Sequence, residues 1–182
     1  MSERPDNIPT RELIEKALME LMEERAYSDI SASAIAKRAG LSRQGFYLHF
    51  KGKDEVLLGY MLRLFSELMD SVDKSGASTV EELVATYTAQ VRQRKDTLSL
   101  LAVNDLGVSP SYAFVRELNK RPPVLKCQRE PGSEDELRYF NTFWVSAFIA
   151  VYTQWFADGM KTPEKELNKI LTDIMKGDYF KT

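Results

Sequence analysis

Apolar residues recur at intervals of three and four along most of the chain, whereas the alternating apolar and polar runs that are typical of strands are scarce. This spacing places the apolar side chains on one face of a helix. The pattern therefore predicts an all-α protein. The first such face follows Pro9 and Thr10 and consists of Leu13, Ile14, Ala17, Leu18, Leu21 and Met22.

Capping residues and glycines divide the first third of the pattern into helices. Ser31 can cap a short second helix that Gly40 ends. Ser42 can cap a third helix, which stops near Phe50, and a long fourth helix then runs to about Lys74. Two short helices joined by a glycine turn are therefore expected before the first long helix.

Two capping boxes predict the starts of later helices. Ser78 with Glu81 begins the fifth helix, and Ser133 with Glu136 begins a long helix that Gly159 ends. The remaining segments are a helix from about Asp96 to Leu106, a helix after Ser109 and Pro110, a loop at 121–132, and a last helix from Thr162 and Pro163 to about Lys176.

The charged residues are unevenly distributed. The whole chain has 25 Lys and Arg and 27 Asp and Glu, which gives a net charge of −2. Residues 30–53 contain no Asp or Glu and carry +5, so the rest of the chain carries −7. A basic segment on an acidic protein is either a solvated face or a surface for a polyanion. Its basic residues are Lys37, Arg38, Arg43, Lys51 and Lys53.

The same segment has the pattern of a helix-turn-helix. Its second helix has small residues that permit close packing, Gly40 permits a left-handed turn, and Leu41 anchors that turn in the core. The helix capped by Ser42 is then the one that enters the major groove of duplex DNA. Lys37 and Arg38 are expected on the outer side of the second helix, where they contribute only a long-range field.

Side chains of the third helix suit the recognition of bases. Arg43 matches the acceptors of guanine, and Gln44 matches the donor and acceptor of adenine. Phe46 and Phe50, assisted by Leu48, are expected to face inward and hold the helix. Contacts with phosphate groups are expected from residues of the flanking positions, namely Ser31, Ser33, Tyr47, His49 and Lys53.

The segment Ile30–Leu57, with the amphipathic helix before it, resembles the TetR/AcrR family of bacterial transcriptional regulators. The resemblance implies that the third helix reads DNA and that Tyr47, His49 and Lys53 hold phosphates. Gly45 departs from the family, which more often has Thr, Ser or Ala there. It either lets the backbone approach a base closely or changes only the specificity. The residues in family register are Ile35, Ala36, Ala39, Gly40, Ser42, Phe46, Tyr47, Phe50 and Lys53.

Residues 144–161, followed by Thr162, Pro163 and Glu164, resemble the last two helices of a group of this family that is common in Gram-positive bacteria. The resemblance implies a dimer interface on these helices and an inducer site in the body. Aromatic residues nearly encircle the first of these helices, which also favours burial on two sides. The residues predicted at the interface are Phe140, Trp144, Phe148, Val151, Trp155, Leu167, Ile170, Leu171 and Ile174. The residues that could line an effector site, or equally fill it, are Tyr87, Gln90, Asn141 and Trp144.

The sequence argues against several other classes of protein. One histidine, His49, and one cysteine, Cys127, cannot build a zinc site within one chain, and no glycine-rich phosphate loop occurs. We therefore expect neither an enzyme nor a cofactor or metal. The longest apolar run, Phe143–Tyr152, is too short to cross a membrane, and a single cysteine fits a reducing compartment. A cytoplasmic location is expected.

Taken together, the patterns predict a helix-turn-helix DNA-binding domain at residues 1–52 and a helical dimerisation and effector-binding domain at residues 53–182. The expected function is transcriptional repression by a homodimer that binds an inverted-repeat operator and is released by a small molecule. One alternative is a regulator without small-molecule sensing that acts through a protein partner. The other is a helical enzyme or binding module unrelated to DNA.

Overall fold

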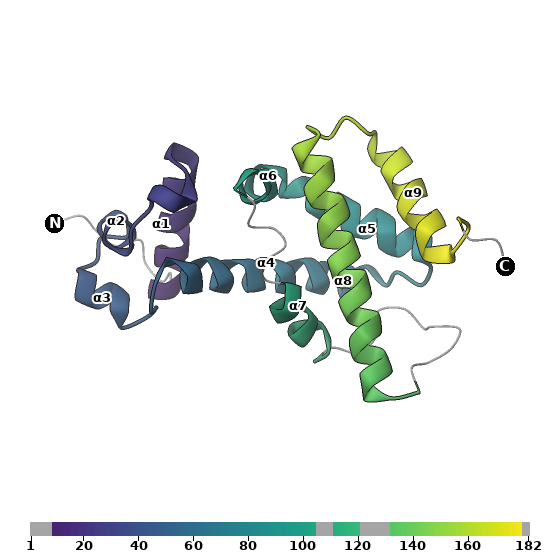
Figure 1. Ribbon diagram of the computed structural model, residues 1–182, viewed down its shortest axis with the longest axis horizontal. Coiled ribbons are helices and arrows are strands. Elements are labelled where there is room, and N and C mark those ends of the chain that lie inside the picture. The colour runs from purple at the N-terminus through teal and green to yellow at the C-terminus, as the bar shows by residue number, and fades with distance from the viewer. Residues whose placement is uncertain (1–8, 105–110, 121–131, 180–182) are drawn as a thin grey trace. The chain divides into compact units, whose positions relative to one another are not determined.

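The computed structural model describes residues 9–104, 111–120 and 132–179, and every regular element within these ranges is helical (Figure 1). This confirms the predicted all-α fold. The α-helices are α1 (Thr10–Glu24), α2 (Ala32–Arg38), α3 (Arg43–Tyr47), α4 (Lys53–Ser75), α5 (Val80–Gln93), α6 (Lys95–Val103), α7 (Ser111–Leu118), α8 (Glu134–Ala157) and α9 (Glu164–Lys176), and a 3-10 turn, η1 (Tyr27–Asp29), lies between α1 and α2.

The chain divides into two compact units, Met1–Arg63 and Leu64–Thr182, called here the N-terminal unit and the C-terminal unit. The division falls within α4, so this helix contributes residues to both units. The domain boundary expected between residues 52 and 53 lies at the start of the same helix.

In the N-terminal unit, α1 packs against α2, and α2 packs against α3. The short helices α2 and α3 bury only two side chains and one side chain, so each of these residues matters for the whole unit. Burial of a side chain of this size contributes about 1.5–3 kcal/mol. The side chains with almost no exposed surface include Ile14, Leu18 and Leu21 of α1, Ile35 of α2, Phe46 of α3, Phe50 and Val56.

The turn between α2 and α3 requires a glycine. Gly40 has a φ angle of 69°, in the left-handed region that a Cβ atom disfavours. The amide of Leu41 donates to the carbonyl of Ala36 at 2.8 Å, and the amide of Gly40 donates to the carbonyl of Lys37 at 3.2 Å. These bonds satisfy the last carbonyls of α2 and lead the chain directly into α3.

An ion pair joins α1 to α4 within the N-terminal unit. Glu15 is 5% exposed, and its carboxylate accepts from Arg63 Nη2 at 2.6 Å and from Arg63 Nε at 3.0 Å. Gly59 of α4 makes room for this carboxylate, because a Cβ atom at Gly59 would lie 3.1 Å from Glu15 Oε1. The glycine inside α4 therefore has a packing reason.

In the C-terminal unit, α9 packs against α5, while α8 packs against α6 and α7. Ion pairs join α5 to α9 at opposite ends, Glu81 with Lys176 and Arg92 with Glu164 (2.7 Å). The two helices are therefore antiparallel. The most deeply buried residues of this unit include Val72, Val84, Thr88, Val91, Leu101, Val115, Tyr152, Leu167 and Leu171.

The capping box of α5 lies one residue later than predicted. Thr79 rather than Ser78 is the N-cap, and its hydroxyl accepts from the amide of Glu82 at 3.2 Å. The Glu82 side chain, not that of Glu81, closes the box on the Thr79 amide. Glu81 is instead paired with Lys176, as described above. Of these two adjacent acids, Glu82 therefore caps α5 and Glu81 joins α5 to α9.

The start of α8 follows the prediction in part. The Ser133 hydroxyl accepts from the Glu136 amide at 3.1 Å, but the Glu136 carboxylate accepts from the amide of Gly132 instead of returning to Ser133. The helix ends at Ala157, before Gly159, as predicted. The signals expected at Gly107, Ser109 and Pro110, most of the loop at 121–132, and Cys127 lie outside the described residues.

Candidate nucleic-acid interface

The position of α3 depends on one fully buried residue. Phe46 has no exposed surface, and its ring centroid lies 6.2 Å from that of Phe50. The hydroxyl of Ser42 accepts from the amide of Gly45 at 3.0 Å and so caps the helix as predicted. Because successive residues of a helix are rotated by about 100°, the side of α3 opposite Phe46 faces solvent.

The solvent side of α3 carries the predicted base-reading side chains. Arg43 and Gln44 are exposed, and the guanidinium carbon of Arg43 lies 5.7 Å from the ring centroid of Tyr47, which is 46% exposed. This cation–π contact favours a shared orientation of the two side chains. The exposed residues Arg43, Gln44, Tyr47 and Leu48 are called the recognition face.

Leu48 does not assist the inward-facing phenylalanines, so this expectation was wrong. Its side chain is 78% exposed, because it lies on the side of the helix opposite Phe46. Phe46 and Phe50 hold the helix without it, with 0% and 1% of their surfaces exposed. A large apolar side chain therefore stands among the polar residues of the recognition face.

Gly45 has a reason within the chain for being glycine. A Cβ atom at this position would lie 3.3 Å from the Ser42 hydroxyl oxygen and 3.8 Å from Leu41 Cβ. A methyl group would therefore crowd the hydroxyl that caps α3. The close approach of its backbone to a base remains a prediction.

The predicted phosphate ligands of the neighbouring segments lie at helix ends. Ser31 caps α2, with its hydroxyl accepting from the amide of Ala34 at 3.2 Å, and Ser33 is exposed in the first turn of that helix. His49 is half-buried after α3. Their contacts with phosphate remain predictions.

Lys53 is held within the chain at the start of α4. Its ammonium group donates to the carbonyls of Tyr27 at 2.7 Å and Ser28 at 3.1 Å, and it lies 4.4 Å from the centroid of the Tyr27 ring. The Tyr27 hydroxyl donates to Asp54. Burial and this bond to a carboxylate raise the pKa of Tyr27. Lys53 thus fixes η1 against α4, in addition to the phosphate contact predicted for it.

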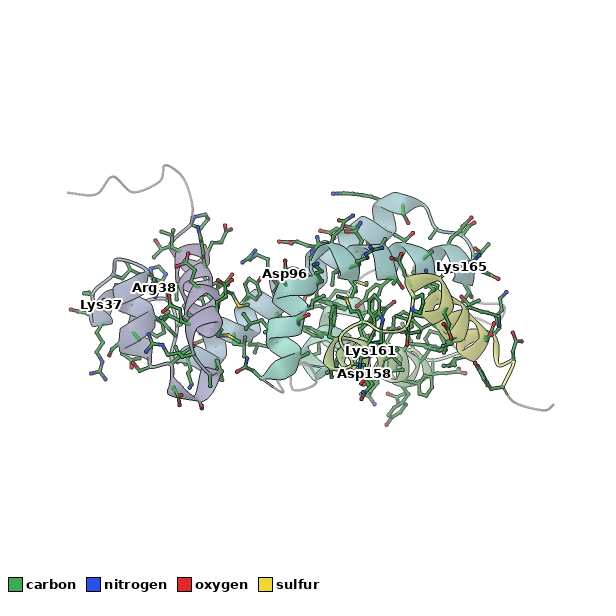
Figure 2. The ribbon with its side chains drawn as sticks, turned by 90° about the horizontal axis from the view of Figure 1, so that it is seen from above. Lys37, Arg38, Asp96, Asp158, Lys161 and Lys165 are labelled. Carbon is green, nitrogen blue, oxygen red and sulfur yellow. The ribbon has the colours of Figure 1, made fainter. Side chains whose placement is uncertain are left out.

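Arg38 was expected on the outer side of α2, and this expectation was wrong. Its guanidinium group forms two bonds with the Glu24 carboxylate, at 2.7 and 2.8 Å, and lies 3.5 Å from Glu20. Figure 2 shows Arg38 between α2 and α1, while Lys37 points away from α1. The acids of α1 therefore neutralise one of the five positive charges of the basic segment.

The sequence pattern missed Arg11, which lies in the first turn of α1. Its guanidinium carbon is 4.0 Å from the centroid of the Phe50 ring, and Nη1 donates to the carbonyl of His49 at 2.7 Å. Arg11 thus places a positive charge beside the end of α3. It lies outside the acid-free segment, so charge patterning offered no signal for it.

The residues predicted at a dimer interface divide into three sets by their exposure. Trp155, Leu167 and Leu171 are 6%, 5% and 3% exposed within their own chain, and the Trp155 indole donates to the carbonyl of Thr162 at 2.8 Å. Phe140 and Ile174 are exposed by 43% and 37%. The half-buried residues are Trp144, Phe148, Val151 and Ile170.

The most exposed aromatic residues of α8 lie beside the predicted stripe. Tyr139 is 67% exposed and Phe143 is 61% exposed, and small residues continue their side of the helix at Ala147 and Ala150. We call Tyr139, Phe140, Phe143, Ala147 and Ala150 the outer face of α8. The rest of the predicted stripe, from Trp144 to Trp155, instead runs along the flank of the helix toward the chain's own core.

The structure brings only part of the predicted effector site together. Phe148 lies between Tyr87 and Trp144, with ring centroids 5.3 and 6.4 Å away. Gln90 is bonded to Arg94, the residue that follows α5, and its Oε1 accepts from Arg94 Nη1 at 2.9 Å. The fourth predicted residue, Asn141, donates to Asn119 after α7.

The residues that the structure describes also bear on two other kinds of site, a metal centre and a membrane span. Within them, no group of three or more His, Cys, Asp or Glu side chains is placed to hold a metal ion. None of the described helices is long and apolar enough to cross a membrane.

Both halves of the chain match family models of regulators. Residues 14–60 match the model described as bacterial regulatory proteins of the tetR family. Residues 123–177 match a model of a transcriptional regulator C-terminal region. The first match spans the helix-turn-helix and the start of α4, and the second spans α8 and α9.

Solved structures share the fold over most of the chain. The TetR family repressor AlkX of Dietzia sp. strain DQ12-45-1b has a TM-score of 0.61 and 17% identity, with 94% of each chain covered. FadR of Thermus thermophilus, a TetR family repressor solved with lauroyl-CoA, has a TM-score of 0.56 and 24% identity, with 91% of each chain covered. The dihydroxyacetone kinase operon activator DhaS has a TM-score of 0.51 and 20% identity, with 93% of this chain and 94% of that chain covered. The helix-turn-helix and the all-α fold of the present chain, together with these matches, show that this chain belongs to the TetR family of bacterial transcriptional regulators.

Proposed function

We propose that this regulator is a homodimer that represses transcription by occupying an inverted-repeat operator. The recognition face carries the proposal, because exposed Arg43 and Gln44 stand on a helix that Phe46 anchors. Residues 30–53 contain no carboxylate, which would repel the phosphates of DNA. In the major groove, Arg43 would bind guanine and Gln44 adenine, each through two hydrogen bonds.

The residues around the recognition face would hold the DNA backbone. Tyr47 and His49 follow the base-reading residues, while Ser31 and Ser33 lie at the start of α2 and Lys53 lies at the start of α4. Contacts with phosphates position the protein without reading sequence. In a two-fold symmetric dimer, the two copies of α3 would enter successive major grooves about 34–36 Å apart.

The experiment for DNA recognition is selection of duplexes from a randomised pool by the full-length protein, followed by binding measurements at several salt concentrations. Arg43→Ala should weaken binding to the selected duplex by about 1–3 kcal/mol and relax the preference at one base position. Arg116→Ala removes the same charge from an exposed position on α7 and serves as the control. Equal effects of the two substitutions on affinity and preference would overturn the assignment of Arg43.

The same proposal places the dimer contact on the outer face of α8. Tyr139 and Phe143 expose large apolar surfaces there, and Ala147 and Ala150 would let a second helix approach closely. Of the predicted interface residues, Phe140 and Ile174 remain exposed enough to contribute to it.

The dimer is tested by Phe143→Asp, which introduces a charge at the centre of this face. The variant should sediment as a monomer in analytical ultracentrifugation and lose most of its affinity for the inverted repeat. Tyr179→Asp changes an aromatic residue of similar exposure, 62% against 61%, in the segment after α9, and should remain dimeric. A Phe143→Asp protein that sediments as a dimer would exclude this interface.

Release by a small molecule is the remaining part of the proposal. The aromatic rings of Tyr87, Trp144 and Phe148 supply an apolar surface between α5 and α8. Lauroyl-CoA, the ligand in the Thermus thermophilus FadR structure, is a suitable first probe. In a Trp155→Phe variant it should change the fluorescence of Trp144 and release operator DNA. The absence of any response, together with a protein that co-purifies reproducibly, would favour the alternative of a regulator that works through a protein partner.

A further inference from the structure

Leu48 is the most exposed large apolar residue on the recognition face, with 78% of its surface accessible. Single exposed apolar side chains are ordinary on protein surfaces, so exposure alone assigns no role. The position of Leu48 on α3 is what gives it meaning.

Leu48 lies one helical turn after Gln44 on the same side of α3. The amide of Leu48 donates to the carbonyl of Gln44 at 3.1 Å, and residues four apart are neighbours on the surface of a helix. Phe46 lies midway between them in sequence and is fully buried, so it points to the opposite side. Gln44 and Leu48 therefore form the ridge of α3 that points most directly away from the core.

A DNA duplex that contacts Gln44 therefore also covers Leu48. Leucine has no donor or acceptor, so neither a phosphate nor the hydrogen-bonding edge of a base is a partner for its side chain. The major groove offers one apolar group, the methyl group of thymine. An A·T pair presents this methyl group beside the adenine atoms that suit Gln44.

We propose that Leu48 is a specificity-determining residue that recognises a thymine methyl group at, or next to, the base pair read by Gln44. The inference rests on the proposed binding of operator DNA by the recognition face. It predicts that each half-site contains a thymine that is preferred for its methyl group and not for its hydrogen-bonding groups.

The test uses the inverted repeat that the full-length protein selects from a randomised duplex pool. Each thymine of a half-site, with its symmetry mate, is replaced by deoxyuridine, which keeps every hydrogen-bonding group and lacks only the methyl group. Wild-type protein should bind one such duplex about fourfold more weakly per contact, the effect of leaving about one methyl group unburied. Leu48→Ala should bind the original duplex more weakly and should be indifferent to deoxyuridine at that position.

Two further variants separate this role from a general loss of binding. Gln44→Ala should relax the preference for adenine while keeping the sensitivity to the methyl group. Tyr47→Phe, which removes a hydroxyl proposed to hold a phosphate, should weaken binding to every duplex equally and keep both preferences. Leu48→Ala should melt at the wild-type temperature in circular dichroism, because its side chain is 78% exposed. The inference is overturned if no deoxyuridine substitution weakens wild-type binding, or if Leu48→Ala is as sensitive as the wild type. A pool that yields no enriched duplex would instead overturn the proposed function, and this inference with it.

Discussion

The two units of the chain differ in how far their defining contacts reach along the sequence. In the N-terminal unit, the caps, the glycine turn and the anchoring phenylalanine of the helix-turn-helix all lie within residues 31–50. In the C-terminal unit, the exposed side of α8 is set by packing on α6 and α7, and the pairing of α5 with α9 joins residues as far apart as Glu81 and Lys176. Local chemistry therefore determines the helix-turn-helix of the first unit, whereas long-range packing determines the second unit.

The strongest test of this difference is Phe46→Ala. Phe46 is fully buried in a unit with a small core, and truncation of such a residue destabilises by about 3–5 kcal/mol. We expect the N-terminal unit to unfold at low denaturant and DNA binding to be lost, while the C-terminal unit keeps its helical signal. Urea unfolding followed by circular dichroism should show two separated transitions.

Phe156→Ala provides the matched substitution in the C-terminal unit, where Phe156 is 8% exposed. It should lower the stability of the C-terminal unit and leave the unfolding transition of the N-terminal unit unchanged. If Phe46→Ala gave a single cooperative transition for the whole chain, the two units would not be independent in stability.

Arg63→Ala should have the next largest effect, within the N-terminal unit. It leaves the buried Glu15 carboxylate without its partner on α4. Because the Arg63 side chain is 40% exposed, the loss should be smaller than the roughly 3–5 kcal/mol of a fully buried pair. Glu15→Gln keeps a hydrogen-bond acceptor toward Arg63 and should cost less, about 1 kcal/mol. Urea unfolding of both variants measures this difference. Equal losses of stability would show that the charge of Glu15 contributes nothing to the contact between α1 and α4.

The sequence predicted the helix-turn-helix in detail because its signals are local. Ser31 and Ser42 each accept a bond from an amide three residues ahead, and Gly40 adopts the left-handed conformation that ends α2. These features depend on neighbours along the chain, so residue type and spacing were sufficient. Arg38 and Lys53 are different, because their partners lie 14 to 26 residues away, on Glu24 and Tyr27. Their charges were predictable and their contacts were not.

The face of α8 could not be predicted from its residues alone. Its apolar residues nearly surround the helix, so the period indicated a helix without selecting a buried side. The structure turns Tyr152, Trp155 and Phe156 inward and leaves Tyr139 and Phe143 outside. That choice depends on how α5, α6 and α7 present their own side chains, and such information is distributed over the chain.

The stability of the two units at alkaline pH should depend on different tyrosines. Burial raises the pKa of Tyr87 in the C-terminal unit to about 12 from the ordinary 10.0. The folded state then holds the phenolic proton more tightly than the unfolded chain, so this stabilisation is complete below about pH 10 and is lost as the pH rises toward 12. Tyr87→Phe should flatten the alkaline loss of stability of the C-terminal unit.

Tyr27→Phe is the corresponding change in the N-terminal unit, because burial and the bond to Asp54 raise the pKa of that phenol too. Burial also raises the pKa of Tyr152 in the C-terminal unit. Thermal melting between pH 8 and pH 11, with each unit followed by its own transition, therefore assigns the alkaline loss to one unit or the other. An unchanged alkaline profile in the Tyr87→Phe protein would exclude this phenol as its source.

The smallest expected effect distinguishes two adjacent basic residues of α2. Arg38 is paired with Glu24 and Glu20 of α1 at an exposed position, so Arg38→Ala should change stability little and leave the salt dependence of DNA binding nearly unchanged. Lys37 is exposed and points away from α1 (Figure 2), so its charge acts on the surroundings of the helix-turn-helix. Lys37→Ala should therefore reduce the association rate with DNA at low salt more than Arg38→Ala does. This difference should disappear near physiological ionic strength, because the Debye length there is only about 8 Å. Stopped-flow association at low and physiological salt measures this difference. A larger effect of Arg38→Ala would mean that the acids of α1 do not neutralise its charge toward DNA.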